Sequence, residues 1–161
     1  MRRLILPLAM LAMGGLLFAA MAWDCVRLAA DARQRVAAAD EEMQKHETRL
    51  VKLLSTSPRR SAEVQTAIET YQAAGDPQTR HGAYEQLVAS FRQSMSAEID
   101  ATNPLDRKFM DDVAGALNRR EIAERQYDDE WARYQAFLGG VRGGLARWFS
   151  SAARDDWKPG G

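Results

Sequence analysis

An uninterrupted apolar stretch at the N-terminus, Leu4–Trp23, constrains this chain more than any other feature of its sequence. It contains no charged side chain over about twenty residues, the number that a helix needs to cross a bilayer. At 1.5 Å per residue, such a helix is roughly 30 Å long, the thickness of the hydrocarbon core. Arg2 and Arg3 precede the stretch, and Trp23 ends it with an indole suited to the membrane–water interface. We therefore predict that residues 1–23 are a membrane anchor.

A cleaved signal peptide, a lipoprotein signal and a buried core helix each fit the residues of this stretch less well. Ala20-Met21-Ala22 matches the pattern of a signal-peptide cleavage site, but the apolar run is long and lacks a polar region before that site. A retained anchor is therefore favoured over a cleaved signal. A lipoprotein is disfavoured because the charged Asp24 directly precedes Cys25. A buried core helix is disfavoured because the run is apolar on every side.

The charges around the anchor predict its orientation. Arg2 and Arg3 lie before it and Asp24 lies after it, which favours a cytoplasmic N-terminus. Arg27, Arg33 and other basic residues soon after the helix oppose this bias. We predict a single-pass protein of the inner cell membrane whose soluble domain is periplasmic or extracytoplasmic.

The rest of the chain has the composition of a helical domain. Lysine plus arginine and aspartate plus glutamate number 22 each, so nothing in the net charge favours a nucleic-acid partner. The single cysteine excludes an internal disulfide. Ala, Glu, Arg and Gln are frequent, and β-branched residues are few. We expect one bundle over residues 24–153 and a flexible tail over residues 154–161.

Apolar spacing predicts where the helices lie. A stripe with steps of three and four residues indicates one helix over Leu4–Leu54, half in lipid and half in water; its members are Ala22, Cys25, Ala29, Ala32, Val36, Ala39, Met43, His46, Leu50 and Leu53. Helical spacing resumes over 58–74 and 79–101. Gly75-Asp76-Pro77 separates these two pieces, and we favour a kink within one long helix over a reversal.

The C-terminal third predicts one more long helix and a short one. Asn103 and Pro104 form a helix start, and the helix then runs over Pro104–Leu138. Its stripe includes three bulky aromatic residues and one charge; the members are Phe109, Val113, Ala116, Arg120, Ala123, Tyr127, Trp131, Tyr134 and Leu138. A short segment follows over Val141–Ala153. The predicted fold is all-α: an N-terminal transmembrane helix continues into an antiparallel bundle of three long helices plus a short C-terminal helix.

No combination of residues predicts catalysis. His46 follows Glu42 at four residues rather than the three of di-iron bundles, and His81 belongs to no such pair. Cys25 lies at the membrane edge without a histidine partner. We therefore predict no catalytic, cofactor-binding or metal-binding residue and no cofactor.

One apolar patch near the C-terminus is a candidate partner-docking surface: Leu145, Trp148 and Phe149. Three antiparallel helices would place it at the end of the bundle far from the membrane. There it either caps the core near Leu53 and Leu54 or remains partly exposed for a partner. Taken alone, the combination of this patch with arginines is typical of a membrane-surface helix. Three antiparallel helices would nevertheless end far from the membrane, which argues against that position.

The sequence resembles the LemA family in three regions. The run 116–135, ALNRREIAERQYDDEWARYQ, places Asn118, Arg119, Arg125, Tyr127 and Tyr134 on family positions. The segment from Asn103-Pro104 to Val113 resembles the family's approach to this helix, and Lys45–Val51 resembles the end of its first helix. The family's Phe-Pro is replaced here by Val141-Arg142, and residues 59–80 match nothing convincingly. The resemblance implies an anchored long-helix bundle without known catalytic activity.

These features predict a non-enzymatic, membrane-anchored helical bundle that acts by protein interaction or in envelope assembly. Its expected partners are membrane lipid, through Leu4–Trp23, and an unidentified protein; homo-oligomers are possible outcomes and nucleic acid is not expected. The alternative is a membrane-tethered coiled-coil adaptor, of an envelope-spanning or lysis type, that acts by oligomerisation. A compact monomer would support the first hypothesis, and a rod-shaped dimer the second.

Overall fold

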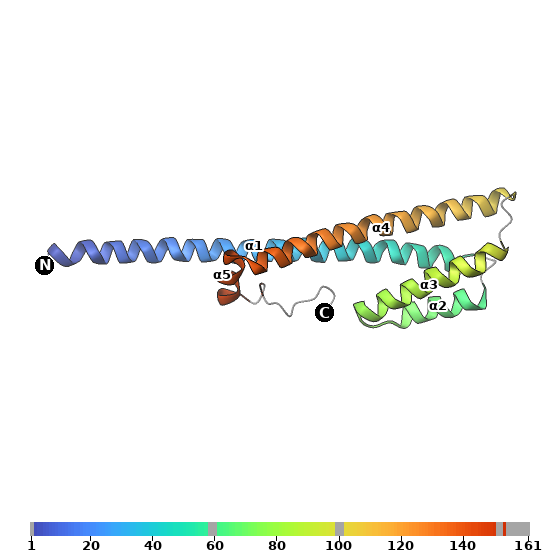
Figure 1. Cartoon of the computed structure of the whole chain (residues 1–161), viewed down its shortest axis with the longest axis horizontal. Helices are drawn as coiled ribbons and strands as arrows, with labels where there is room; N and C mark the ends of the chain where they lie inside the picture. The colour runs from blue at the N-terminus through green and yellow to red at the C-terminus, as the bar shows by residue number, and fades with distance from the viewer. Residues whose placement is uncertain (1, 58–60, 99–101, 151–152, 154–161) are drawn as a thin grey trace. The chain divides into compact units, whose positions relative to one another are not determined.

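The computed structural model describes residues 2–57, 61–98, 102–150 and 153, and its regular elements are five α-helices (Figure 1). They are α1 (Arg2–Ser55), α2 (Ala62–Ala73), α3 (Pro77–Glu98), α4 (Pro104–Gly139) and α5 (Val141–Phe149). The chain divides into two compact units. Of the described residues, the anchor unit contains those up to Val36 and those from Asp129 to Ala153, and the core unit contains Ala37–Asp128 without the gaps named above. The predicted all-α class is confirmed; the predicted tail lies outside the described residues.

Helix α1 confirms the prediction of one unbroken helix from the apolar stretch into the polar region. Among the described residues it is the one helix long and apolar enough to cross a membrane. Its large apolar side chains are exposed: Met10, Leu11, Met13, Leu16, Leu17, Phe18, Met21 and Trp23. Exposed apolar area of this extent is unfavourable in water. A signal sequence would meet the same criteria of length and composition.

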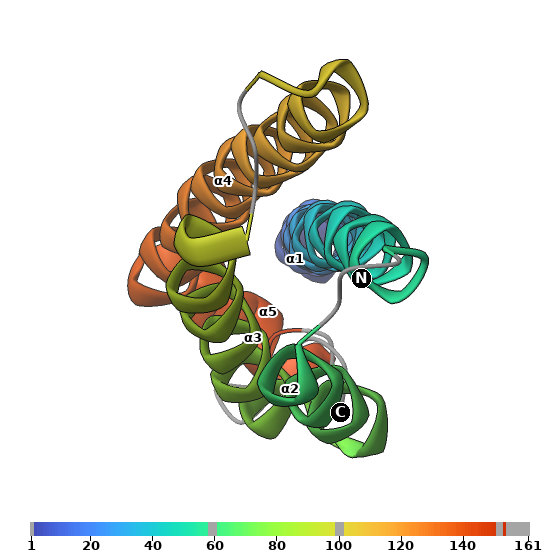
Figure 2. The same ribbon diagram turned by 90° about the vertical axis from the view of Figure 1, so that its right-hand side faces the viewer.

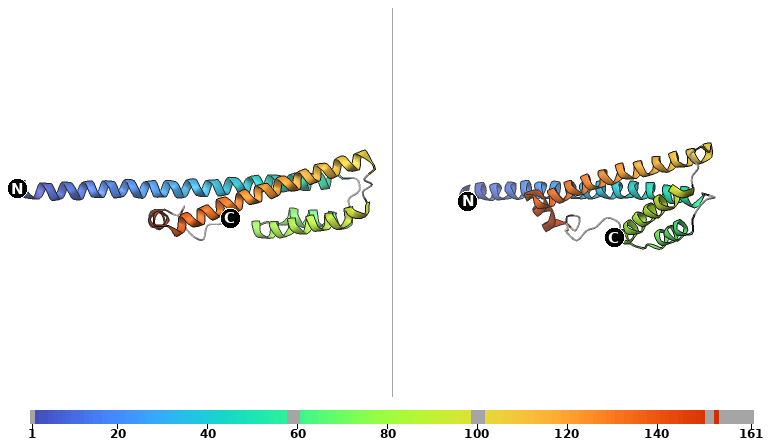
Figure 3. Two further views of the ribbon diagram at one scale, coloured as in Figure 1. Left: turned by 45° about the horizontal axis from the view of Figure 1, so that its top comes forward. Right: turned by 45° about the vertical axis from the view of Figure 1, so that its right-hand side comes forward.

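The core unit buries one apolar cluster to which four helices contribute. Helix α1 contributes Leu50, Val51 and Leu54, and α2 contributes Val64, Ala67, Ile68 and Tyr71. Members from α3 and α4 include Tyr84, Leu87, Phe91, Val113 and Ala116. Removing such side chains from water supplies about 25 cal/mol per Å² of apolar area. Helices α2 and α3 lie side by side in every view (Figures 2 and 3).

The expectation of a kink at Gly75-Asp76-Pro77 is wrong, because the chain reverses there. Helix α2 ends at Ala73 and α3 begins at Pro77. The Asp76 carboxylate accepts a hydrogen bond from the Thr79 backbone N–H at 3.0 Å, so Asp76 caps a new helix. The Tyr71 and Tyr84 rings meet edge to face at 6.3 Å across the hairpin. The described ranges therefore contain two long helices, a helical hairpin and a short C-terminal helix, rather than three long helices and a short one.

The buried stripe of α1 is confirmed at its start and changes position later. Ala22, Cys25, Ala29, Ala32 and Val36 are all buried, as predicted. Beyond them, the predicted Leu50 is also buried, whereas the predicted Ala39 and Leu53 are half-buried. The other buried positions here are ones that the stripe did not include: Asp40, Glu47, Val51 and Leu54. A straight helix has 3.6 residues per turn, so a strict repeat of 3.5 drifts by about 20° per heptad. The buried face consequently advances by one residue.

Helix α4 begins and packs as predicted. The Asn103 side-chain oxygen accepts a hydrogen bond from the Leu105 backbone N–H at 3.0 Å. Most of the predicted stripe is buried, including Val113, Arg120 and Leu138. Tyr134 has no exposed area, whereas its neighbour Trp131 is only half-buried, and their rings lie 5.8 Å apart. Tyr134 is therefore the principal buried aromatic residue of α4 in the anchor unit.

Tyr134→Ala should lower the free energy of unfolding by about 3–5 kcal/mol, the usual cost of deleting a buried aromatic ring. Trp131→Ala is the matched control and should cost clearly less, because part of its ring is already in water. Urea unfolding of the full chain in detergent, followed by circular dichroism, measures both. Equal losses would contradict the assignment of Tyr134 as the buried member of the pair.

Candidate functional site

Helix α5 is folded tightly against the end of α4. A Cβ atom added to Gly143 would lie 2.2 Å from the Phe137 carbonyl oxygen and 2.6 Å from the Leu138 Cα, so no side chain fits there. The Arg147 guanidinium donates a hydrogen bond to the Leu138 carbonyl oxygen at 2.7 Å. This bond satisfies one of the carbonyls left unpaired at a helix C-terminus. These two contacts therefore fix the corner between α4 and α5; Figure 3 shows α5 at the end of α4.

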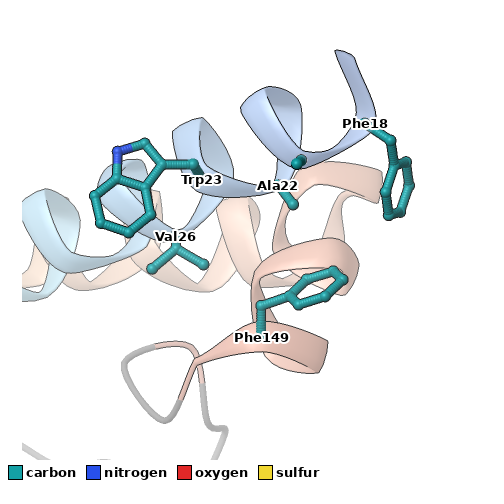
Figure 4. A pocket seen from close by; sticks show the side chains of 6 residues that line it. Phe18, Ala22, Trp23, Val26 and Phe149 are labelled. Atoms are coloured by element: carbon teal, nitrogen blue, oxygen red, sulfur yellow. The ribbon is translucent and has the colours of Figure 1, made fainter. Parts of the chain in front are cut away.

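The corner brings α5 against the apolar stretch of α1. The Phe149 ring meets the Phe18 ring edge to face, with centroids 6.2 Å apart. Between the helices lies an apolar pocket of about 300 Å³ (Figure 4). Its lining is entirely apolar or aromatic: Phe18, Ala19, Ala22, Trp23, Val26 and Phe149. This pocket at the end of the predicted anchor is the first candidate site.

Of the predicted docking residues, Phe149 lines this pocket, and Leu145 and Trp148 lie on the same short helix, α5. Trp148 is 85% exposed, Phe149 is 54% exposed and Leu145 is half-buried. The expectation that this patch lies near Leu53 and Leu54 is wrong, because Phe149 contacts Phe18. The physical reason is the α2–α3 hairpin, which adds one more reversal than a kinked helix would. Whether these three residues bind a partner remains a prediction.

A buried charged group in the core unit forms the second candidate site. Arg120 of α4 is 5% exposed, and Glu47 of α1 is 2% exposed. Arg120 Nη2 lies 3.5 Å from Glu47 Oε1 and 3.2 Å from His81 Nδ1 on α3. The other terminal guanidinium nitrogen, Nη1, pairs with Glu124 one turn along α4. The two nitrogens thereby link α1, α3 and α4.

Two tyrosines complete this group. The Tyr71 hydroxyl on α2 donates a hydrogen bond to Glu47 Oε2 at 3.1 Å. The Arg120 guanidinium carbon lies 4.6 Å from the centroid of the Tyr84 ring on α3, within the range of a cation–π interaction. We call Glu47, Tyr71, His81, Tyr84, Arg120 and Glu124 the Arg120 cluster. It has members on each of the four helices that form the core unit.

Burial sets the protonation behaviour of the Arg120 cluster. Desolvation raises the pKa of Glu47 above its usual value, although the charge of Arg120 and the Tyr71 hydrogen bond oppose the rise. Desolvation, reinforced by the Glu47 charge, raises the pKa of Tyr71 to about 12. Desolvation also raises the pKa of Tyr84, although Arg120 opposes the rise. Both tyrosines are therefore neutral at physiological pH, and the Tyr71 hydroxyl keeps the proton that it donates to Glu47.

The arrangement is suited to holding helices together. The Arg120 guanidinium is engaged by Glu47, Glu124 and His81, and Glu47 is engaged by Arg120 and Tyr71. Buried ionic groups of this kind are strongly destabilising when one partner is removed. Within the described ranges, no group of three His, Cys, Asp or Glu side chains is placed to hold a metal ion. His46 pairs with Glu42 at 3.3 Å, and Cys25 is a buried thiol.

Sequence reasoning placed Arg120 on the apolar stripe of α4 but did not identify its partners. Glu47 was missed because the strict heptad put His46 inward in its place. A charged residue on an apolar stripe is itself a signal, since a buried cation requires a buried partner. With a period of 3.6 residues, Glu47 becomes the matching position on α1.

Comparisons of the chain with protein-family models, with curated proteins and with solved structures find no match. The resemblance to the LemA family therefore stays a prediction, which rests on the residues of α1 and α4 quoted above.

Arg120→Met should lower the free energy of unfolding by about 3–5 kcal/mol, the cost of breaking a buried ion pair and leaving its partner uncompensated. Arg119→Met is the matched control, because Arg119 is the adjacent residue and is exposed; it should change stability by less than about 0.5 kcal/mol. Chemical unfolding of the full chain in detergent compares the two. A small effect of Arg120→Met would mean that the Arg120 cluster does not hold the core unit together.

The raised pKa of Glu47 also predicts a pH dependence. The folded chain binds the Glu47 proton more tightly than the unfolded chain, whose Glu47 has the ordinary value of 4.5. Stability from this group therefore falls as pH rises from 4.5 through the raised pKa. The unfolding free energy of the wild type relative to Glu47→Gln should fall over that range. A relative stability that rises with pH would show that attraction to Arg120 outweighs desolvation.

Proposed function

We propose that this chain is a non-enzymatic, single-pass membrane protein that acts by holding a helical bundle at the membrane for interaction with another protein. The observation that carries the proposal is α1 itself. Its N-terminal part exposes apolar side chains from Met10 to Trp23, and its later part buries a stripe within the chain. A helix that is apolar all round and then becomes amphipathic suits a passage from lipid to water.

The proposed location is the inner cell membrane, with the N-terminus in the cytoplasm and the soluble part in the periplasm or outside the cell. Support for this orientation comes from Arg2 and Arg3 before the apolar stretch and Asp24 after it. The resemblance of the α1 and α4 segments to the LemA family supports the same class of protein. In that class, the antiparallel bundle would serve as the interaction module.

An observation in the anchor unit favours a bundle over an oligomeric coiled-coil tether. The stripe that would join two chains in a coiled coil is buried within one chain, from Ala22 to Val36. Arg35 of α1 pairs with Glu130 of α4 at 3.2 Å beside it. A stripe already covered by its own chain offers little apolar surface to a second copy.

Alkaline carbonate extraction of cell membranes tests the anchor. The wild-type chain should remain in the membrane pellet with its mass unchanged. The double variant Leu11→Arg/Leu16→Arg should be released, because each charge at the centre of a span costs about 2.5–3.5 kcal/mol. Release of the wild type, or a mature chain that begins after Ala22, would contradict the proposal.

A further inference from the structure

Helix α5 has the chemistry of a helix that lies on a membrane surface. Its nine residues include Arg142 and Arg147 and no acidic residue. Val141 and Trp148 are 84% and 85% exposed, and Phe149 is also exposed. Basic residues combined with exposed aromatic and aliphatic side chains are typical of interfacial helices. In water this apolar surface would be costly, and no described part of the chain covers it.

The depth of α5 relative to α1 follows from one contact. Phe149 meets Phe18, which precedes Trp23 by about one and a half turns of α1. If Trp23 marks the membrane–water interface, Phe18 lies roughly 7.5 Å deeper at 1.5 Å per residue. Interfacial helices bury their apolar face about 5–10 Å below the headgroup boundary. The Phe18–Phe149 contact therefore places Phe149 at the depth that such a helix occupies.

We propose that α5 is a second membrane contact, an interfacial helix inserted into the same bilayer that α1 crosses. The proposal rests on the proposed function, because it requires α1 to be an anchor. Trp148 and Phe149 enter the boundary between headgroups and acyl chains, and Arg142 faces the headgroups. An acyl chain fills the pocket between Phe18 and Phe149, whose lining offers it mostly apolar contacts.

The exposed side of α5 is continuous with the exposed apolar side of α1 and is positively charged, and both properties favour lipid as its occupant. The exposed side of α5 adjoins the exposed apolar residues of α1, which the bilayer covers in the proposed function. A soluble partner on α5 would have to displace the lipid around Phe18. Arg142, which is exposed on a helix without an acidic residue, is complementary to anionic lipid headgroups. A lipid surface would cover the exposed apolar residues of both α5 and α1, whereas a protein bound to α5 would cover those of α5 alone.

Quenching of tryptophan fluorescence by brominated lipids tests the proposal directly. The full chain is reconstituted into phosphatidylcholine–phosphatidylglycerol vesicles whose acyl chains carry bromine near the headgroup. One variant keeps only Trp148, with the other three tryptophans changed to Phe, and a second keeps only Trp23. The control carries Gln34→Trp and no other tryptophan, because Gln34 is exposed about three turns beyond Trp23 on α1.

Trp148 should be quenched about as strongly as Trp23 and several-fold more than the tryptophan at position 34. Quenching of Trp23 together with a Trp148 signal equal to that of the control would overturn the interfacial helix and leave the anchor intact. Absence of quenching at both Trp23 and Trp148 would overturn the anchor itself, and the interfacial helix with it. The three chains thereby separate failure of this inference from failure of the proposed function.

Discussion

The structure depends on the need to cover one side of α1. From Ala22 to Leu54 this helix carries a stripe that cannot remain in water, and each unit buries its own part of it. In the anchor unit the residues of the stripe are small, and Arg35 pairs with Glu130 of α4 beside them. In the core unit, Leu50 and Leu54 join a cluster shared with α2, α3 and α4. Small residues permit close approach of helices, and larger ones supply more buried area.

The Arg120 cluster adds specificity to this packing. Apolar side chains tolerate a shift of one helix along another, whereas Arg120 must meet Glu47 to avoid an uncompensated buried charge. Tyr71 and His81 bring α2 and α3 into the same arrangement. We interpret the cluster as the element that fixes the register of the hairpin on the two long helices, and the hairpin in turn sets the direction in which α4 runs.

Much of the fold could be predicted from the sequence, and the errors have definite causes. The long helices were predicted almost to the residue, since their stripes and the Asn103-Pro104 start are local signals. The hairpin was missed although Asp76-Pro77 is a start similar to Asn103-Pro104, because a kink within one long helix was favoured over a reversal. Because of that single error, Phe149 was predicted at the end of the bundle far from the membrane. The pocket beside Phe18 could not be predicted, because it depends on the tertiary contact between α1 and α5.

The proposed membrane contact of α5 depends most directly on the position of this helix beside the apolar stretch of α1. Thiol crosslinking measures it in native membranes, in a chain with Cys25→Ala, Phe18→Cys and Phe149→Cys. A short bifunctional thiol reagent should join the two positions within one chain, because the native rings lie 6.2 Å apart. A matched chain with Cys25→Ala, Leu11→Cys and Phe149→Cys should give little product. Equal crosslinking in the two chains, or none in either, would contradict the account.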